Sequence, residues 1–95
     1  MKLVTIVCEA ILEERVVQLL RESGAHGYTA FLVRGSGNQG DRNADMAETG
    51  NVQIQVIVKT SVSETLITRL QSELFKDYAM VAYETEVRVM RPEKF

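Results

Sequence analysis

Hydrophobic and polar positions divide the chain into segments with two different periods. Residues 2–8 are rich in β-branched side chains, which is typical of a buried strand. Over residues 10–23 the apolar positions recur at the spacing of one helical face, so a helix is predicted there. Glutamates near the start of this segment suit the helix dipole, and Gly24 is the residue expected to end the helix. The apolar face consists of Leu12, Val16, Leu19 and Leu20.

The remaining segments follow the same two patterns. Residues 27–33 read as a strand, and strict alternation of apolar and polar residues predicts a half-buried antiparallel strand over residues 52–58. Ser61 and Glu64 have the spacing of a capping box, which predicts the start of a second helix over residues 62–74. Its apolar face consists of Leu66, Ile67, Leu70 and Leu74. Residues 79–90 predict a last strand, in which one face carries Val81, Tyr83, Thr85, Val87 and Val89.

The resulting order, β-α-β-β-α-β, predicts an α+β fold of the ferredoxin-like kind in a single domain that spans residues 1–95. Its four-stranded antiparallel sheet would carry both helices on one face. The other face stays uncovered in a monomer, and apolar side chains there would drive association into dimers or trimers. Because this fold supports many functions, function has to be argued from particular residues.

A long loop is expected between the second and third strands. Residues 34–50 hold four of the chain's six glycines and few apolar residues. Long loops in compact domains are usually functional or disordered. Glycines allow a backbone to approach a ligand closely, and Arg34 and Arg42 add positive charge. Two interpretations are open: a mobile flap that folds over an anion such as phosphate, or a disordered hairpin tip.

Composition narrows the classes of function. The net charge of −2 does not favour electrostatic binding of nucleic acid. The first and third predicted strands also lack the aromatic residues on which RNA-recognition domains stack bases. No apolar run is long enough to span a membrane, and the start of the chain lacks the apolar core of a signal peptide, so a soluble cytoplasmic protein is expected. Cys8 is the only cysteine and is interpreted as a small buried apolar residue.

Residues suited to catalysis or metal binding are sparse. His26 is the only histidine, and no second His or Cys accompanies it at ligand spacing, so no metal site is predicted. Asp41, Asp45 and Asp77 have no evident His partner for a Ser-His-Asp triad. The loop glycines are not followed by the Lys-Ser/Thr pair of a phosphate-binding P-loop.

Four segments together resemble the PII-like signalling proteins: GAHGYT, GSGNQGDRN, FKDYAMVAYETEV and RPEKF. The resemblance covers nearly the whole chain and is nearest to a subgroup linked to inorganic carbon. Members of that subgroup are associated with a bicarbonate transporter or are encoded beside carboxysome genes. The resemblance implies a non-enzymatic cytoplasmic homotrimer that binds an adenine nucleotide in clefts between subunits. The ligand would be AMP, ADP, ATP or cyclic AMP, with or without bicarbonate, and no metal.

The same resemblance implies how the protein signals and which residues bind the ligand. Residues 35–50 form the T-loop of this family, which responds to the nucleotide and would be read by a target such as a bicarbonate transporter or a carboxysome-related protein. Backbone N–H groups of the turn at residues 76–80 would close over the phosphates, and two late arginines would add charge. The implied nucleotide-binding residues are Gly27, Tyr28, Thr29, Gly35, Gly37, Arg42, Lys76, Asp77, Tyr78, Ala79, Met80, Arg88 and Arg91. For Tyr78 the alternative is a plain core residue.

The chain departs from the family in three respects. The T-loop lacks the tyrosine that is uridylylated in nitrogen-sensing members, no clear match to a second subgroup arginine follows Arg42, and the tail lacks a cysteine pair. These departures argue against classical nitrogen control and give no support to redox switching of the tail. Two alternatives stand beside the sensor: slow hydrolysis of a phosphate ester in the same cleft, and a divalent-metal-binding trimer of the same fold. The single His26 and Cys8 argue against the metal-binding trimer unless several subunits supply ligands.

Overall fold

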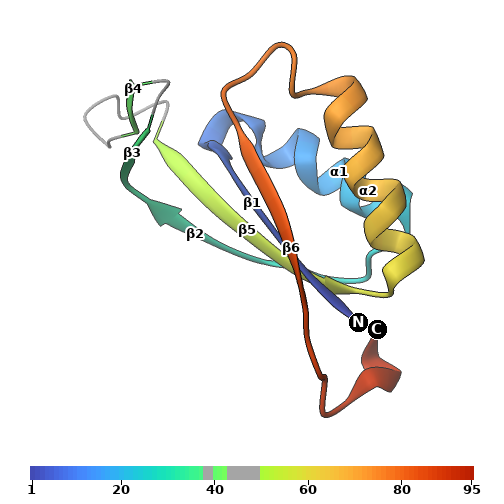
Figure 1. Cartoon of the computed structure of the whole chain (residues 1–95). Coiled ribbons are helices and arrows are strands. Elements are labelled where there is room, and N and C mark those ends of the chain that lie inside the picture. Colours follow the sequence, from blue (N-terminus) through green and yellow to red (C-terminus); the bar gives the residue numbers. More distant parts are fainter. Residues whose placement is uncertain (38–39, 43–49) are drawn as a thin grey trace.

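A four-stranded antiparallel sheet with both helices on one face forms the body of the molecule (Figure 1). The computed structural model describes residues 1–37, 40–42 and 50–95. The strand order is β2-β5-β1-β6, so the predicted ferredoxin-like α+β arrangement is confirmed. Its elements are β1 (Lys2–Glu9), α1 (Glu13–Ser23), β2 (Thr29–Val33), β5 (Asn51–Val58), α2 (Thr60–Glu73) and β6 (Val81–Glu86).

The core lies between the helices and one face of the two central strands. β1 pairs with β5 along eight residues, which sets Val4, Ile6 and Cys8 opposite Val56, Ile54 and Val52. All six side chains are buried, as predicted from the alternation over residues 52–58 and from the β-branched content of residues 2–8. The helices complete this core with Leu12, Val16, Leu19, Leu20, Leu66, Leu70 and Leu74.

The first helix begins later than predicted and ends where predicted. Residues 10–12 form a 3₁₀ turn, and the α-helix starts at Glu13 rather than at residue 10. The tight turn lets the chain leave β1 and still bury Leu12. Gly24 ends the helix with φ of 107°, a left-handed conformation that glycine adopts without a Cβ penalty.

The predicted capping box at Ser61 and Glu64 is wrong. Helix α2 begins at Thr60, its N-cap is Lys59 in an extended conformation, and no side chain caps it. Ser61 lies inside the helix, where its carbonyl accepts a bond from the Thr65 hydroxyl. The helix starts here because β5 ends at Val58 and the chain has to turn at once.

The last strand is shorter than predicted. β6 covers Val81–Glu86 rather than residues 79–90, because it lies at the edge of the sheet and, within the described residues, pairs with β1 alone. The pairing runs from Val7 opposite Val81 to Lys2 opposite Glu86, and the partner strand ends there. Of the residues predicted to share one face of this strand, Val81, Tyr83 and Thr85 lie within β6, and Val87 and Val89 lie beyond its end.

The sheet face opposite the helices carries exposed apolar side chains. In each strand, every second side chain lies on this open face. Phe31, Val81 and Tyr83 are 44%, 50% and 53% exposed there. The apolar residues of the open face are Leu3, Val7, Phe31, Val33, Ile57, Val81 and Tyr83.

The segment between β2 and β5 contains regular structure that the sequence did not predict. Strands β3 (Gly35–Gly37) and β4 (Gly40–Arg42) pair as an antiparallel ribbon that continues from the end of β2 (Figure 1). The predicted mobility of the T-loop concerns residues 38–39 and 43–49 as well, which lie outside the described residues. Neither described helix has the length and apolar character needed to cross a membrane.

Candidate functional site

The two ends of the sheet carry different parts of the predicted site. At one end, here called the loop end, Val33 lies opposite Asn51, and β6 begins. At the other, the tail end, Lys2 lies opposite both Val58 and Glu86. The strands are antiparallel, so each end gathers residues that are far apart in the sequence.

The loop end holds the glycine ribbon and the turn before β6. Gly35 pairs with Arg42 at the base of the ribbon, directly after β2. Residues 76–80 connect α2 to the start of β6 at the same end of the sheet (Figure 1). Lys76 and Asp77 are exposed there, while Met80 packs against the core.

The turn after α2 closes without a glycine because its own backbone bonds satisfy the helix end. The carbonyl of Leu70 accepts bonds from Leu74 and Phe75, and the carbonyl of Leu74 accepts bonds from Asp77 and Tyr78, all at 3.0–3.1 Å. Tyr78 is 38% exposed, so its interpretation as a core residue is wrong. Phe75 and Met80, on either side of it in the sequence, pack against the core instead.

The tail end holds the other predicted residues. Thr29 is the first residue of β2, lies opposite Gln55 and is exposed, and Gly27 and Tyr28 precede it. Arg88 and Arg91 follow β6 beyond the same end. Among the described residues these two arginines form no ion pair, and both are exposed, so their guanidinium groups are available to an anion.

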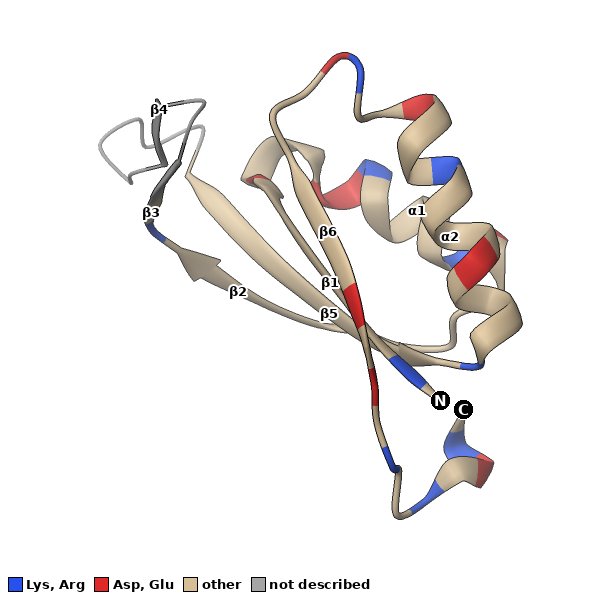
Figure 2. Ribbon diagram, viewed as in Figure 1, with Lys and Arg blue, Asp and Glu red and all other residues tan. Residues whose placement is uncertain are grey.

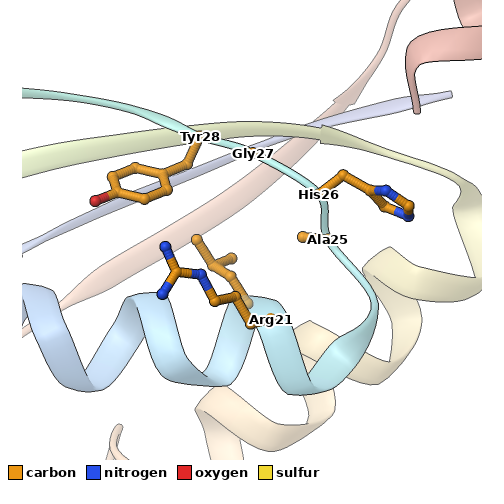
Figure 3. A pocket seen from close by; sticks show the side chains of 6 residues that line it. Arg21, Ala25, His26, Gly27 and Tyr28 are labelled. Atoms are coloured by element: carbon orange, nitrogen blue, oxygen red, sulfur yellow. The ribbon is translucent and has the colours of Figure 1, made fainter.

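A pocket of about 240 Å³ opens between α1 and the segment that leads into β2. The Arg21 guanidinium points toward the ring of Tyr28, whereas His26 points away from it (Figure 3). Arg21 and Tyr28 also line a neighbouring groove of about 500 Å³ along α1. Arg21 is not among the residues predicted from the sequence, because helical spacing does not show which exposed arginine faces the next strand. The 240 Å³ pocket is lined by Leu20, Arg21, Ala25, His26, Gly27 and Tyr28.

Acidic residues of β6 are neutralised at the tail end. The amino group of Met1 contacts the Glu86 carboxylate at 3.1 Å, and the Lys2 ammonium contacts it at 3.2 Å. These hydrogen bonds, first that of the amino group and then that of Lys2, hold the pKa of Glu86 below its usual range. Lys2 also approaches Glu84 at 3.9 Å, and Figure 2 shows acidic and basic segments meeting where β6 passes the start of β1. The negative charge next to Arg88 is therefore already compensated.

A single chain does not bring the two groups of predicted residues together. β6 and Val87 separate the turn at residues 76–80 from Arg88. At about 3.3 Å per residue, the eight steps from residue 80 to residue 88 span roughly 26 Å. Within the described parts of the chain, no three His, Cys, Asp or Glu side chains are grouped in a way that could hold a metal ion. The predicted ligand residues therefore fall into two separate groups, one at each end of the sheet.

Comparison with known proteins identifies the family. The model of the family described as nitrogen regulatory protein P-II matches residues 1–94. The chain belongs to this family, and its PII-like character, expected from the sequence, is confirmed.

Solved structures agree with this assignment. A PII-like signaling protein from Thermus thermophilus is 44% identical, with a TM-score of 0.86 over 99% of this chain and 93% of that one. CPII from Thiomonas intermedia, bound to ADP and bicarbonate, is 25% identical, with a TM-score of 0.89 over 99% of this chain and 92% of that one. A further structure of CPII, bound to ADP, AMP and acetate, is 26% identical, with a TM-score of 0.80 over the same shares of the two chains.

Proposed function

We propose that this protein is a non-enzymatic signalling protein that binds an adenine nucleotide in clefts between the subunits of a homotrimer. The observation that carries the proposal is the division of the predicted ligand residues between the loop end and the tail end of the sheet. In a ring of identical chains the loop end of one subunit can meet the tail end of the next. Each cleft would then combine both halves of the site.

The chemistry of the two halves suits a nucleotide. Exposed Lys76 at the loop end and exposed Arg88 and Arg91 at the tail end would share the phosphate charge. Tyr28, with its exposed ring beside Arg21, offers an aromatic surface for the base. A relative of the same fold binds ADP together with bicarbonate, which supports ADP as the first ligand to test and bicarbonate as a second ligand.

The signalling output would pass through the T-loop, residues 35–50, whose ribbon continues from β2 at the loop end of the sheet, where Lys76 would contact the phosphates. A ligand that favours one state of this loop by a few kcal/mol is sufficient to change recognition by a partner. We propose a cytoplasmic role in inorganic carbon metabolism, with a bicarbonate transporter or a carboxysome-related protein as the target.

The first experiment measures binding and chemistry together. Isothermal titration calorimetry with AMP, ADP, ATP and cyclic AMP, with and without bicarbonate, gives the affinities, and chromatography of the same samples detects hydrolysis. Arg91→Ala should weaken ADP binding by about 1.5–3 kcal/mol, the range for hydrogen bonds to charged groups. Arg15→Ala is the matched control, because Arg15 is an exposed arginine on α1 whose loss should leave affinity unchanged.

Subunit mixing tests whether the cleft lies between chains. Lys76→Ala and Arg91→Ala trimers should each bind ADP weakly. Mixed trimers pair an intact loop end from one variant with an intact tail end from the other, so part of the sites should regain normal affinity. Mixed trimers that bind no better than either variant alone would show that both residues act within one chain, or not at all.

A further inference from the structure

The chain after β6 is attached to the body at two points. At the first, the N–H of Val87 donates to the carbonyl of Met1 at 3.0 Å, which extends the pairing with β1 by one bond. At the second, a 3₁₀ turn over Pro92–Lys94 reverses the chain. Figure 1 shows this reversal, which returns the last residues to the side of the sheet where the chain starts.

The second attachment is made by Phe95. Its side chain is half-buried and borders a pocket of about 110 Å³. The pocket lies where α1 ends and α2 begins, and its walls include the left-handed Gly24. The N–H of Phe95 donates to the carbonyl of Pro92 at 3.1 Å, which closes the turn that brings Phe95 to this pocket. The other lining residues are Gly24, Ala25, His26, Ile57, Val58, Lys59 and Val62.

Both tail arginines lie between these two attachments. Arg88 follows the bond of Val87 directly, and Arg91 begins the turn that leads to Phe95, with its carbonyl accepting a bond from Lys94 at 3.2 Å. The pocket of Phe95 shares Ala25 and His26 with the pocket that contains Gly27 and Tyr28. Phe95 therefore lies beside the segment that leads into β2, and the arginine segment is the part of the chain that connects it to β6.

We infer that Phe95 is a positioning residue that keeps Arg88 and Arg91 in place for the anionic part of the nucleotide. This inference rests on the proposed function. A loose tail would have to lose backbone and side-chain freedom each time a nucleotide binds, and this loss would reduce the affinity. The anchored tail has lost that freedom already. Phe95 itself brings no charge to the ligand, so its effect must pass through the arginines.

The anchor is tested without any ligand. His26 is the only histidine, so its imidazole gives a single set of proton NMR signals, and these should shift when the neighbouring aromatic ring is removed. Phe95→Ala should shift the His26 Hε1 signal and speed hydrogen exchange of the backbone over residues 88–95. Met90→Ala is the matched control, because Met90 is an apolar residue of the same tail that is 72% exposed. An unchanged His26 signal and unchanged exchange in Phe95→Ala would overturn the anchor.

Positioning is tested with ADP. Phe95→Ala should weaken ADP binding roughly tenfold, which corresponds to the ordering of two rotamer-rich side chains. Phe95→Leu should restore most of the affinity, and Met90→Ala should leave it unchanged. In the double variant with Arg91→Ala, the Phe95 effect should become clearly smaller, because Phe95 then positions only Arg88. If Phe95→Ala only lowered the stability of the fold, its effect on ADP affinity would be the same with and without Arg91→Ala.

The outcomes separate the inference from the proposed function. A wild-type protein that binds no adenine nucleotide ends the proposed function, and the positioning role falls with it, whatever the NMR result. Wild-type binding combined with a released tail and unchanged ADP affinity in Phe95→Ala overturns the positioning role alone. Additive effects of Phe95→Ala and Arg91→Ala would overturn it as well.

Discussion

Arg69 links the two helices through two carboxylates. Its Nη1 lies 2.8 Å from Oε1 of Glu22 on α1, and its Nε lies 2.7 Å from Oε2 of Glu73 on α2. Hydrogen bonds from Arg69 hold the pKa of both glutamates below the usual range, with Gln18 adding a smaller effect on Glu22. All of these groups reach solvent, so the contribution to stability is modest and sensitive to salt.

Arg69→Met should remove an acid-sensitive part of the free energy of unfolding. A carboxyl group whose folded pKa is depressed contributes stability that is fully present above its unfolded pKa, about 4.3 for glutamate. That stability is lost as the pH falls through the folded pKa. The stability difference between wild type and Arg69→Met should therefore be largest near neutral pH and shrink toward zero below about pH 4.

Urea unfolding across this pH range measures the difference directly. Arg15→Met is the control, because Arg15 acts on Glu73 only as a more distant charge and should give a smaller effect. Equal offsets between wild type and Arg69→Met at every pH would show that Arg69 stabilises through packing of its aliphatic stem rather than through the carboxylates.

Single residues were predictable from the sequence where one local rule decides their environment. Gly24 follows from the helix end that it completes, and the buried residues of β5 follow from their alternation. The exposure of Tyr78 and the position of Arg21 beside Tyr28 depend on neighbours that are distant in the sequence. No spacing rule reports those neighbours. The core interpretation of Tyr78 was therefore wrong, and Arg21 was not predicted.

At the scale of elements, type was predictable and boundaries were not. Helical and alternating periods predict α1, α2 and β5 because each element buries one face. The end of β6 is set by the length of β1, and the start of α2 is set by the end of β5. Both boundaries therefore depend on a partner strand, and the capping motif and β-branched residues that suggested other limits had no influence.

A pair of serine substitutions tests the start of α2. Ser61→Ala should change the free energy of unfolding by less than about 0.5 kcal/mol, because no side chain caps this helix. Ser63→Ala should cost about 1 kcal/mol or more, because Ser63 is fully buried and its hydroxyl donates to the Glu84 carboxylate. Thermal or urea unfolding of both variants gives the comparison. A loss of about 1 kcal/mol in Ser61→Ala would instead support the capping box predicted from the sequence.

At the scale of the molecule, the fold follows from the sequence more fully than the site does. The order of the elements fixes a sheet with one covered face, and the family match agrees with it. The resemblance implied that the ligand residues line clefts between subunits, without saying which end of a subunit supplies each residue. Within one chain the antiparallel topology divides the predicted residues between the loop end and the tail end. Their combination in one cleft depends on how subunits pack, and no spacing in the sequence reports that packing.

The open face of the sheet is predicted to be the interface between subunits. Seven apolar side chains lie on the open face, and Tyr83 is one of the most exposed among them at 53%. Burial of this face between copies would be the main driving force for a trimer. Tyr83→Glu should therefore dissociate the protein, because a charge buried without a partner costs several kcal/mol.

Light scattering coupled to size-exclusion chromatography gives the mass directly. Wild type should have three times the mass of the chain at micromolar concentration, and Tyr83→Glu should shift toward the monomer. Gln71→Glu is the control, because it adds the same charge at an exposed position of α2, on the face of the sheet opposite the open face (Figure 1). A monomeric wild type, or a Tyr83→Glu variant that stays trimeric, would mean that the open face is not the interface. The proposed meeting of the loop end of one subunit with the tail end of the next would then lose its basis.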